Sequence, residues 1–181
     1  SNERSAGVRQ NGSSLQRRIS IQEAEDGGVC TATMMVSTDA GSIIEAYAQD
    51  NSDIDFYLAG YWSSPPGTYT EKFNDITIPT SDHTWQDRNL SGAPWNVPGN
   101  AVAEIVFGNQ DTDEEDEMGV RQNGSTLSRY LDIVECEAGG LAAARMHVKA
   151  DASSIIEVYH EDVSDSHAFY LAGYWQLVST G

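Results

Sequence analysis

Residues 169–175 read FYLAGYW, and the same seven letters stand at residues 56–62. The match extends far upstream of this block. Between residues 7–53 and 119–165, about 27 of 47 positions are identical without a gap, and one residue is then inserted before FYLAGYW. The chain therefore contains an internal duplication.

Apolar residues alternate with polar residues on both sides of a Gly-Gly pair in each copy. Ile19 and Ile21 stand before Gly27-Gly28, and a period of two continues from Cys30 to Val36. Such alternation indicates strands, and two strands around Gly-Gly predict a β-hairpin. No segment has the apolar stripe of an amphipathic helix.

Further alternating segments predict more strands, and Asn-Gly pairs before Gly-Gly predict tight turns. Counting the strands between and within the copies gives about eight in about 107 residues. The expected fold class is all-β, with tandem β-sandwich (jelly-roll-like) repeat units, one complete and one truncated. The additional predicted strands are 42–47 with 154–159, the two FYLAGYW blocks, 69–79, 84–90 and 101–109.

The predicted strands are unequally divided along the chain. Residues 1–62, the first copy, carry only the later strands of the unit, and 63–68 have the composition of a linker. Residues 69–175, the second copy, carry the complete set, and 176–181 begin another linker. Three interpretations remain open. The chain is a fragment of a longer array, or another chain supplies the missing strands, or the segment repeated at 7–62 and 119–175 is itself the module and 63–118 are shared between two modules.

Charge and cysteine content limit the class of protein. The 181 residues carry a formal net charge of −18, and such a field repels nucleic acid and anionic membranes. Cys30 and Cys136 occupy non-equivalent positions in the two copies, so we expect no disulfide within each unit and no bridge between the two. Neither a membrane-spanning apolar run nor a signal peptide is present in the sequence.

Two acidic clusters are candidate calcium sites, because hard cations take several carboxylate oxygens from one loop. Solvated turns are the competing interpretation of both. Ca²⁺ is the one cofactor that the sequence suggests. The cluster residues are Asp111, Asp113 and Glu115 in one and Asp50, Asp53 and Asp55 in the other. His160, Asp162 and His167 have the residue types of a transition-metal site, but the first copy has Ala48 in place of the first histidine.

Tyrosines of the FYLAGYW blocks, with one tyrosine from the preceding predicted strand, are the candidate ligand-binding residues. On one strand face they would form a platform for stacking on sugar rings. Packing in a core or against a neighbouring repeat is the alternative. The residues are Tyr47, Tyr57 and Tyr61 in the first copy and Tyr159, Tyr170 and Tyr174 in the second.

The repeated arginines have a structural interpretation. Arg9 and Arg17 recur as Arg121 and Arg129, and we expect them to pair with Glu45, Glu157 or another carboxylate. No Gly-x-Ser-x-Gly occurs, and we expect no enzyme activity.

These features favour a structural repeat module of an extracellular fibre, a cell surface or a virion surface. Its expected partners are other copies of itself or neighbouring repeats, associating by strand or edge complementation. A carbohydrate-binding or adhesin module that uses the tyrosine face is the alternative, and a glycan-active enzyme is a third. We expect neither nucleic-acid binding nor membrane insertion.

Overall fold

The computed structural model describes residues 4–21, 32–50, 52, 54–58, 60–61, 67–135, 141–164 and 166–177. This part of the chain contains eleven strands and no helix, so the predicted all-β class is confirmed. The strands are β1 (Arg4–Gln10), β2 (Ile19–Ile21), β3 (Ile44–Ala48), β4 (Gly67–Asp75), β5 (Gln86–Asn89), β6 (Val102–Asn109), β7 (Asp116–Gln122), β8 (Tyr130–Ile133), β9 (Ala142–Lys149), β10 (Ile155–His160) and β11 (His167–Leu177).

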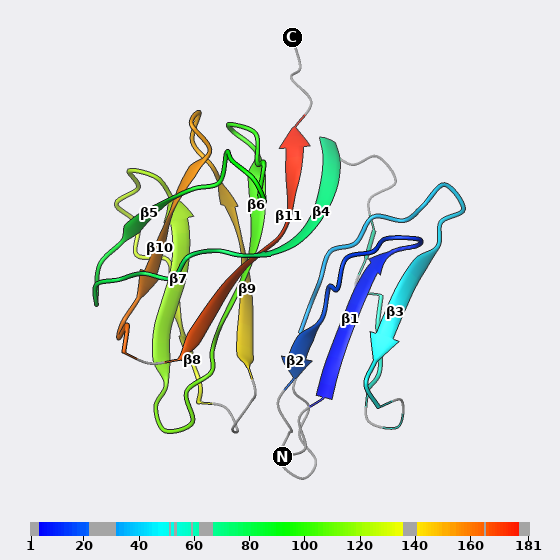
Figure 1. Ribbon diagram of the computed structural model, residues 1–181, viewed down its shortest axis with the longest axis horizontal. Coiled ribbons are helices and arrows are strands. Elements are labelled where there is room, and N and C mark those ends of the chain that lie inside the picture. The colour runs from blue at the N-terminus through cyan, green and yellow to red at the C-terminus, as the bar shows by residue number, and fades with distance from the viewer. Residues whose placement is uncertain are drawn as a thin grey trace.

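The second copy forms a sandwich of two antiparallel four-stranded sheets (Figure 1). Sheet B has the order β4-β11-β6-β9, and sheet C has the order β5-β10-β7-β8. The first and last strands of the unit, β4 and β11, are neighbours in sheet B. Successive strands alternate between the two sheets except for β7 and β8, which pair within sheet C, and this is the jelly-roll arrangement. Phe107 and Phe169, with ring centroids 5.7 Å apart, lie in the core between the sheets together with Ile105 and Leu171. The predicted jelly-roll-like sandwich is therefore confirmed for this copy.

The predicted β-hairpin around Gly-Gly is wrong in the second copy. β8 pairs with β7 in sheet C, whereas β9 pairs with β6 in sheet B. The chain crosses from one sheet to the other between them. An alternating pattern reports one buried strand face and not the identity of the partner strand, so the sequence pattern could not distinguish the two arrangements.

The sequence pattern also missed β1 and β7, which are equivalent strands at the start of the repeated segment. Asp116 and Glu117, which directly follow the acidic cluster of Asp111, Asp113 and Glu115, belong to β7. Gly119 in this strand is required because an added Cβ would lie 2.0 Å from the carbonyl oxygen of Arg129. Gly124 has φ +73°, and Ser125 N donates to Gln122 O at 3.0 Å. The predicted Asn-Gly turn is therefore confirmed.

The first copy does not form a sandwich of its own in the described residues. β1, β2 and β3 form sheet A in the order β2-β1-β3, and they are the sequence equivalents of β7, β8 and β10. Their registers agree, since Ala6 pairs with Ile19 as Met118 pairs with Leu131. The strands predicted at 30–36 and 56–62 are not formed in their described parts.

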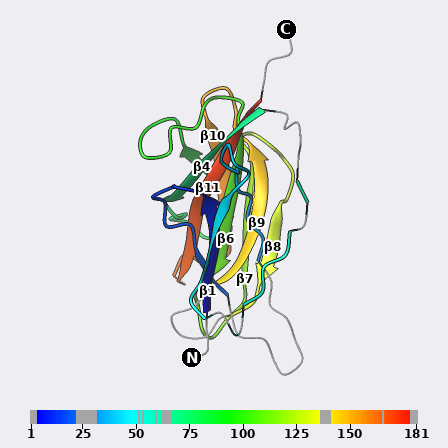
Figure 2. The same ribbon diagram turned by 90° about the vertical axis from the view of Figure 1, so that its right-hand side faces the viewer.

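Sheet A packs against the outer face of sheet B, the face that points away from sheet C. Figure 1 shows sheet B in the middle of three layers, and Figure 2 looks onto the stack from the side of sheet A. β2 contacts β9. Ile19 of β2 is buried in one cluster with Val106 of β6 and Ala172 of β11. Sheet B is therefore covered on both faces. β4 begins at Gly67, two residues before the predicted start of the second copy.

Candidate functional site

The interface between sheets A and B contains a buried charged network. Along β6, Ala103, Ile105 and Phe107 face the core, so the alternating Glu104 must face sheet A. Its carboxylate is fully buried and accepts from Arg145 Nη1 at 2.7 Å, from Met35 N at 3.2 Å and from the Tyr69 hydroxyl. Burial and the Glu104 carboxylate raise the pKa of Tyr69. A charge buried at a sheet centre is stable only when it is paired in this way.

Arg17 brings the first copy into this network. Its guanidinium, which is fully buried, lies 3.4 Å from Glu71 Oε1 and donates to the Tyr69 hydroxyl at 3.2 Å. It also donates to four backbone carbonyls, two from each copy, at 2.9–3.3 Å. These belong to Val8, Met35, Lys72 and Ala172. One side chain therefore joins both copies.

Glu71 of β4 accepts backbone donors from the first copy as well as the Arg17 guanidinium. Gln10 N donates to its two carboxylate oxygens at 3.1 and 3.2 Å, and Ser37 N donates to Oε1 at 3.3 Å. We call Tyr69, Glu71 and Glu104, with the carbonyls of Lys72 and Ala172, the acceptor face of sheet B. We call Gln10, Arg17, Met35 and Ser37 the arginine edge of the first copy. The interface is therefore chemically complementary and directional.

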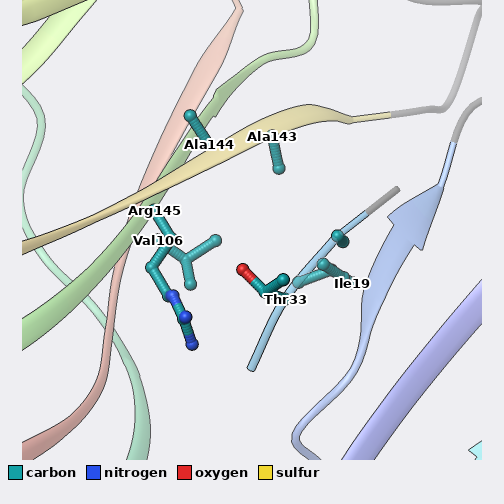
Figure 3. Close-up of a pocket in the computed structure, with 7 residues that line it drawn as sticks. Ile19, Thr33, Val106, Ala143, Ala144 and Arg145 are labelled. Atoms are coloured by element: carbon teal, nitrogen blue, oxygen red, sulfur yellow. The ribbon is translucent and has the colours of Figure 1, made fainter. Parts of the chain in front are cut away.

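A small cavity accompanies the network. It has a volume of about 220 Å³ and lies between Ile19 and Thr33 of the first copy and Val106, Ala143 and Arg145 of sheet B (Figure 3). Ala32 and Ala144 complete its lining. Ligand pockets usually have about 300–1,000 Å³, so the small alanine-lined space is a gap in the packing between copies.

Equivalent residues of the two copies differ sharply in burial. Phe56 is 46% exposed and Leu58 81%, whereas their equivalents Phe169 and Leu171 are 1% and 0% exposed. Ile44 of β3 is 40% exposed, while the equivalent Ile156 is fully buried. The first copy therefore presents on its surface an apolar set that is core in the second copy.

The predicted tyrosine platform is not assembled in the second copy. Tyr170 lies on the outer face of sheet B, stacked on Phe73 with centroids 5.1 Å apart. Tyr174 is buried in the core, because a register shift between Leu171 and Gly173 reverses the facing of the strand. Tyr159 belongs to sheet C. In the first copy Tyr47, Tyr57 and Tyr61 are all exposed.

An aromatic strip that the sequence pattern missed lies on sheet C. Tyr159 stands between Trp85 and Tyr130, with both centroid distances 5.2 Å, and the Arg121 guanidinium lies 4.2 Å from the Trp85 centroid. Burial and Glu117 raise the pKa of Tyr159 to about 12. Trp85 has no equivalent in the first copy, so the duplication could not point to it.

The predicted pairing of the repeated arginines with carboxylates is confirmed for Arg9 and Arg121, and Arg17 pairs with Glu71, but Arg129 pairs with no carboxylate among the described residues. Arg9 Nε lies 2.5 Å from Glu45 Oε2, and Arg121 Nε lies 2.7 Å from Glu157 Oε2. Each pair links neighbouring strands of sheets A and C, respectively. These contacts have a structural role.

The candidate calcium residues make contacts typical of turns. Asp111 Oδ1 accepts from Asp113 N at 2.7 Å, and Asp50 Oδ1 accepts from Ser52 N at 3.0 Å. Glu115 and Asp55 are exposed, and Asp53 lies outside the described residues. Within the described ranges no three His, Cys, Asp or Glu side chains converge as metal ligands. Calcium binding stays a prediction, as does the absence of a Cys30–Cys136 bridge, because both cysteines lie outside the described residues.

Two buried histidines lie at the edge of the second copy's core. The rings of His160 and His167 stack with centroids 3.5 Å apart, and His160 Nε2 lies 3.5 Å from Asp116 Oδ2. Burial and the neighbouring His167 lower the pKa of His160 to about 4. Stacked rings do not aim their nitrogens at one point, and Asp162 instead accepts from Ser164 N. The residues predicted as a transition-metal set do not converge.

Comparisons with protein-family models and with curated proteins find no match for this chain. In the described part of the chain, no helix is long and apolar enough to cross a membrane.

Proposed function

We propose that this chain is a non-enzymatic structural repeat module of an extracellular fibre, a cell surface or a virion surface, and that it associates with further repeats by strand complementation. One observation carries the proposal. Ile44, Phe56 and Leu58 are exposed, while their equivalents in the second copy lie in the core; these are Ile156, Phe169 and Leu171. An exposed apolar set of this kind marks an interaction surface.

The second copy indicates the kind of partner that fits this surface. There, β11 carries the FYLAGYW block and lies between β4 and β6. Strands equivalent to β4 and β6 are absent from the sequence of residues 1–62. A strand block like residues 67–109, supplied from outside the first copy, is therefore the complementing partner.

Sedimentation velocity of the whole chain tests this proposal at physiological salt, where the repulsion from a net charge of −18 is screened. We expect concentration-dependent association that Leu58→Asp abolishes. Ile78→Asp introduces the same charge at an exposed apolar residue of the second copy and should leave association intact. A native chain that stays monomeric at all concentrations, or equal effects of the two substitutions, contradicts the proposal.

Carbohydrate binding remains a second candidate function, favoured by the aromatic strip on sheet C. Trp85, Tyr130 and Arg121 supply flat apolar faces beside a charged donor, a combination suited to sugar rings. Glycan-array binding that is lost in Trp85→Ala but retained in Tyr57→Ala would support this role. Loss in Tyr57→Ala with retention in Trp85→Ala would instead favour the exposed tyrosines of the first copy.

A further inference from the structure

The donors that hold the first copy on sheet B have sequence equivalents in the second copy. Gln10, Arg17, Met35 and Ser37 correspond to Gln122, Arg129, His147 and Lys149, which we call the arginine edge of the second copy. Three of the four contribute backbone N–H groups. Replacement of Met35 and Ser37 by histidine and lysine therefore leaves the donors themselves unchanged.

The local geometry of this edge is also repeated. Arg129 Nη2 donates to His147 O at 3.2 Å, just as Arg17 Nη1 donates to Met35 O at 2.9 Å. The preceding turn repeats too, since Arg121 donates to Leu127 O at 3.1 Å and Arg9 donates to Leu15 O at 3.1 Å. The guanidinium of the second copy is therefore held in place by the same turn as Arg17.

Most of the edge of the second copy is accessible, although the His147 ring contacts the first copy, with Nε2 3.0 Å from Met35 Sδ. β9 is the outermost strand of sheet B, and β8 is the outermost strand of sheet C on the same side. Leu127, Leu131 and Val134 are exposed beside Arg129. Among the described residues, no carboxylate pairs with Arg129, whereas Arg17 pairs with Glu71. A strand edge with exposed apolar side chains is a template for association.

We propose that the arginine edge of the second copy docks on the acceptor face of a further unit of this sequence, as the first copy docks on sheet B here. The inference rests on the proposed function as a module of an array. The partner is a unit whose Glu71, Glu104 and Tyr69 are uncovered, and charge complementarity selects it. Because edge and face are different surfaces of one unit, the contact is head-to-tail and extends a linear array.

The test uses two variants of the whole chain. Arg17→Glu places a carboxylate against Glu71 and Glu104, so that the first copy detaches and the acceptor face opens. The double substitution Arg17→Glu with Arg129→Glu makes a receptor with an open face and a disabled edge. The binding partner keeps both Arg17 and Arg129, so that its edge is intact and its face is covered. This partner should bind the receptor in a 1:1 complex. All chains carry Leu58→Asp, so that association through the first copy's apolar surface does not contribute.

The expected results follow from the geometry. Arg129→Glu in the native partner should weaken binding to the receptor at least about 30-fold, and Arg17→Glu alone should form concentration-dependent oligomers. Equal binding by the two partners, or no complex although hydrogen exchange shows sheet B uncovered, overturns the inference. A first copy that stays docked in Arg17→Glu also overturns it, because the arginine then does not select this face. Failure of the Leu58-dependent association alone would contradict the proposed function and leave this result standing.

Discussion

Replacing Arg17 with methionine is expected to weaken the docking of sheet A on sheet B by about 3–5 kcal/mol. Methionine keeps most of the apolar stem but supplies no donor. The guanidinium is fully buried and contacts four carbonyls, one hydroxyl and the Glu71 carboxylate. At about 1 kcal/mol for each hydrogen bond, the total contribution of these contacts is similar to the expected loss in docking free energy. The loss cannot exceed the free energy of docking, because sheet A can detach.

Calorimetry and hydrogen exchange together measure this effect. If sheet A stays docked, Tm should fall by about 6–20 °C, at about 2–4 °C per kcal/mol for a chain of this size. If sheet A detaches, the second copy melts as before and the amides of β1 and β2 lose protection. Arg129→Met is the matched control, and with its partly exposed guanidinium it should cost less than about 1 kcal/mol. Equal losses in the two variants would refute the assignment of Arg17 as the joint between copies.

Three other perturbations follow from the same structure. Because the pKa of His160 is lowered to about 4, its ring stays neutral in the folded protein while the unfolded chain takes up a proton below pH 6.5. The free energy of unfolding should therefore fall by up to about 3 kcal/mol as the pH decreases from 6.5 to 4. His160→Ala should flatten that dependence in urea unfolding at a series of pH values, and an unchanged slope would contradict it. Leu171→Ala should lower the free energy of unfolding by about 2–5 kcal/mol and Leu58→Ala by less than about 0.5 kcal/mol. Similar urea midpoints for the two variants would show that the surface around Leu58 is buried in solution. Gly119→Ala should cost more than about 2 kcal/mol because its Cβ meets a carbonyl 2.0 Å away, and Gly124→Ala only about 1 kcal/mol; thermal melts that reverse this order would contradict the packing.

The fold was more predictable from the sequence than the site. Alternation along 101–109 indicated β6, and the spacing of predicted strands was enough for a two-sheet sandwich. The pattern could not assign β8 and β9 to different sheets. Apolar residues alternate along any strand that has one buried face, whichever strand it pairs with. It also could not tell which outward residue of β6 is buried. Glu104 looks like a solvent-facing residue in the sequence, but in the fold the docked first copy buries it together with Tyr69 and Arg145.

Identical sequence also misled the prediction where the surroundings differ. The FYLAGYW block is β11 in one copy and contains no strand in the described residues of the other. A strand needs neighbours on its hydrogen-bonding edges, and only the second copy contains β4 and β6. The orientation of Tyr174 was also unpredictable. The bulge between Leu171 and Gly173 turns its side chain into the core, and no local sequence pattern predicts the bulge.

Sheet B as a shared middle layer sets the order in which the protein can form during translation. Arg17 is synthesised 155 residues before Ala172, whose carbonyl it contacts. At about 5–20 residues per second, the first copy waits roughly 8–30 s for the sheet on which it packs. During that interval Ile19 and its neighbours have no surface to cover them. The nascent first copy is therefore the part of the chain in which we expect chaperones to bind.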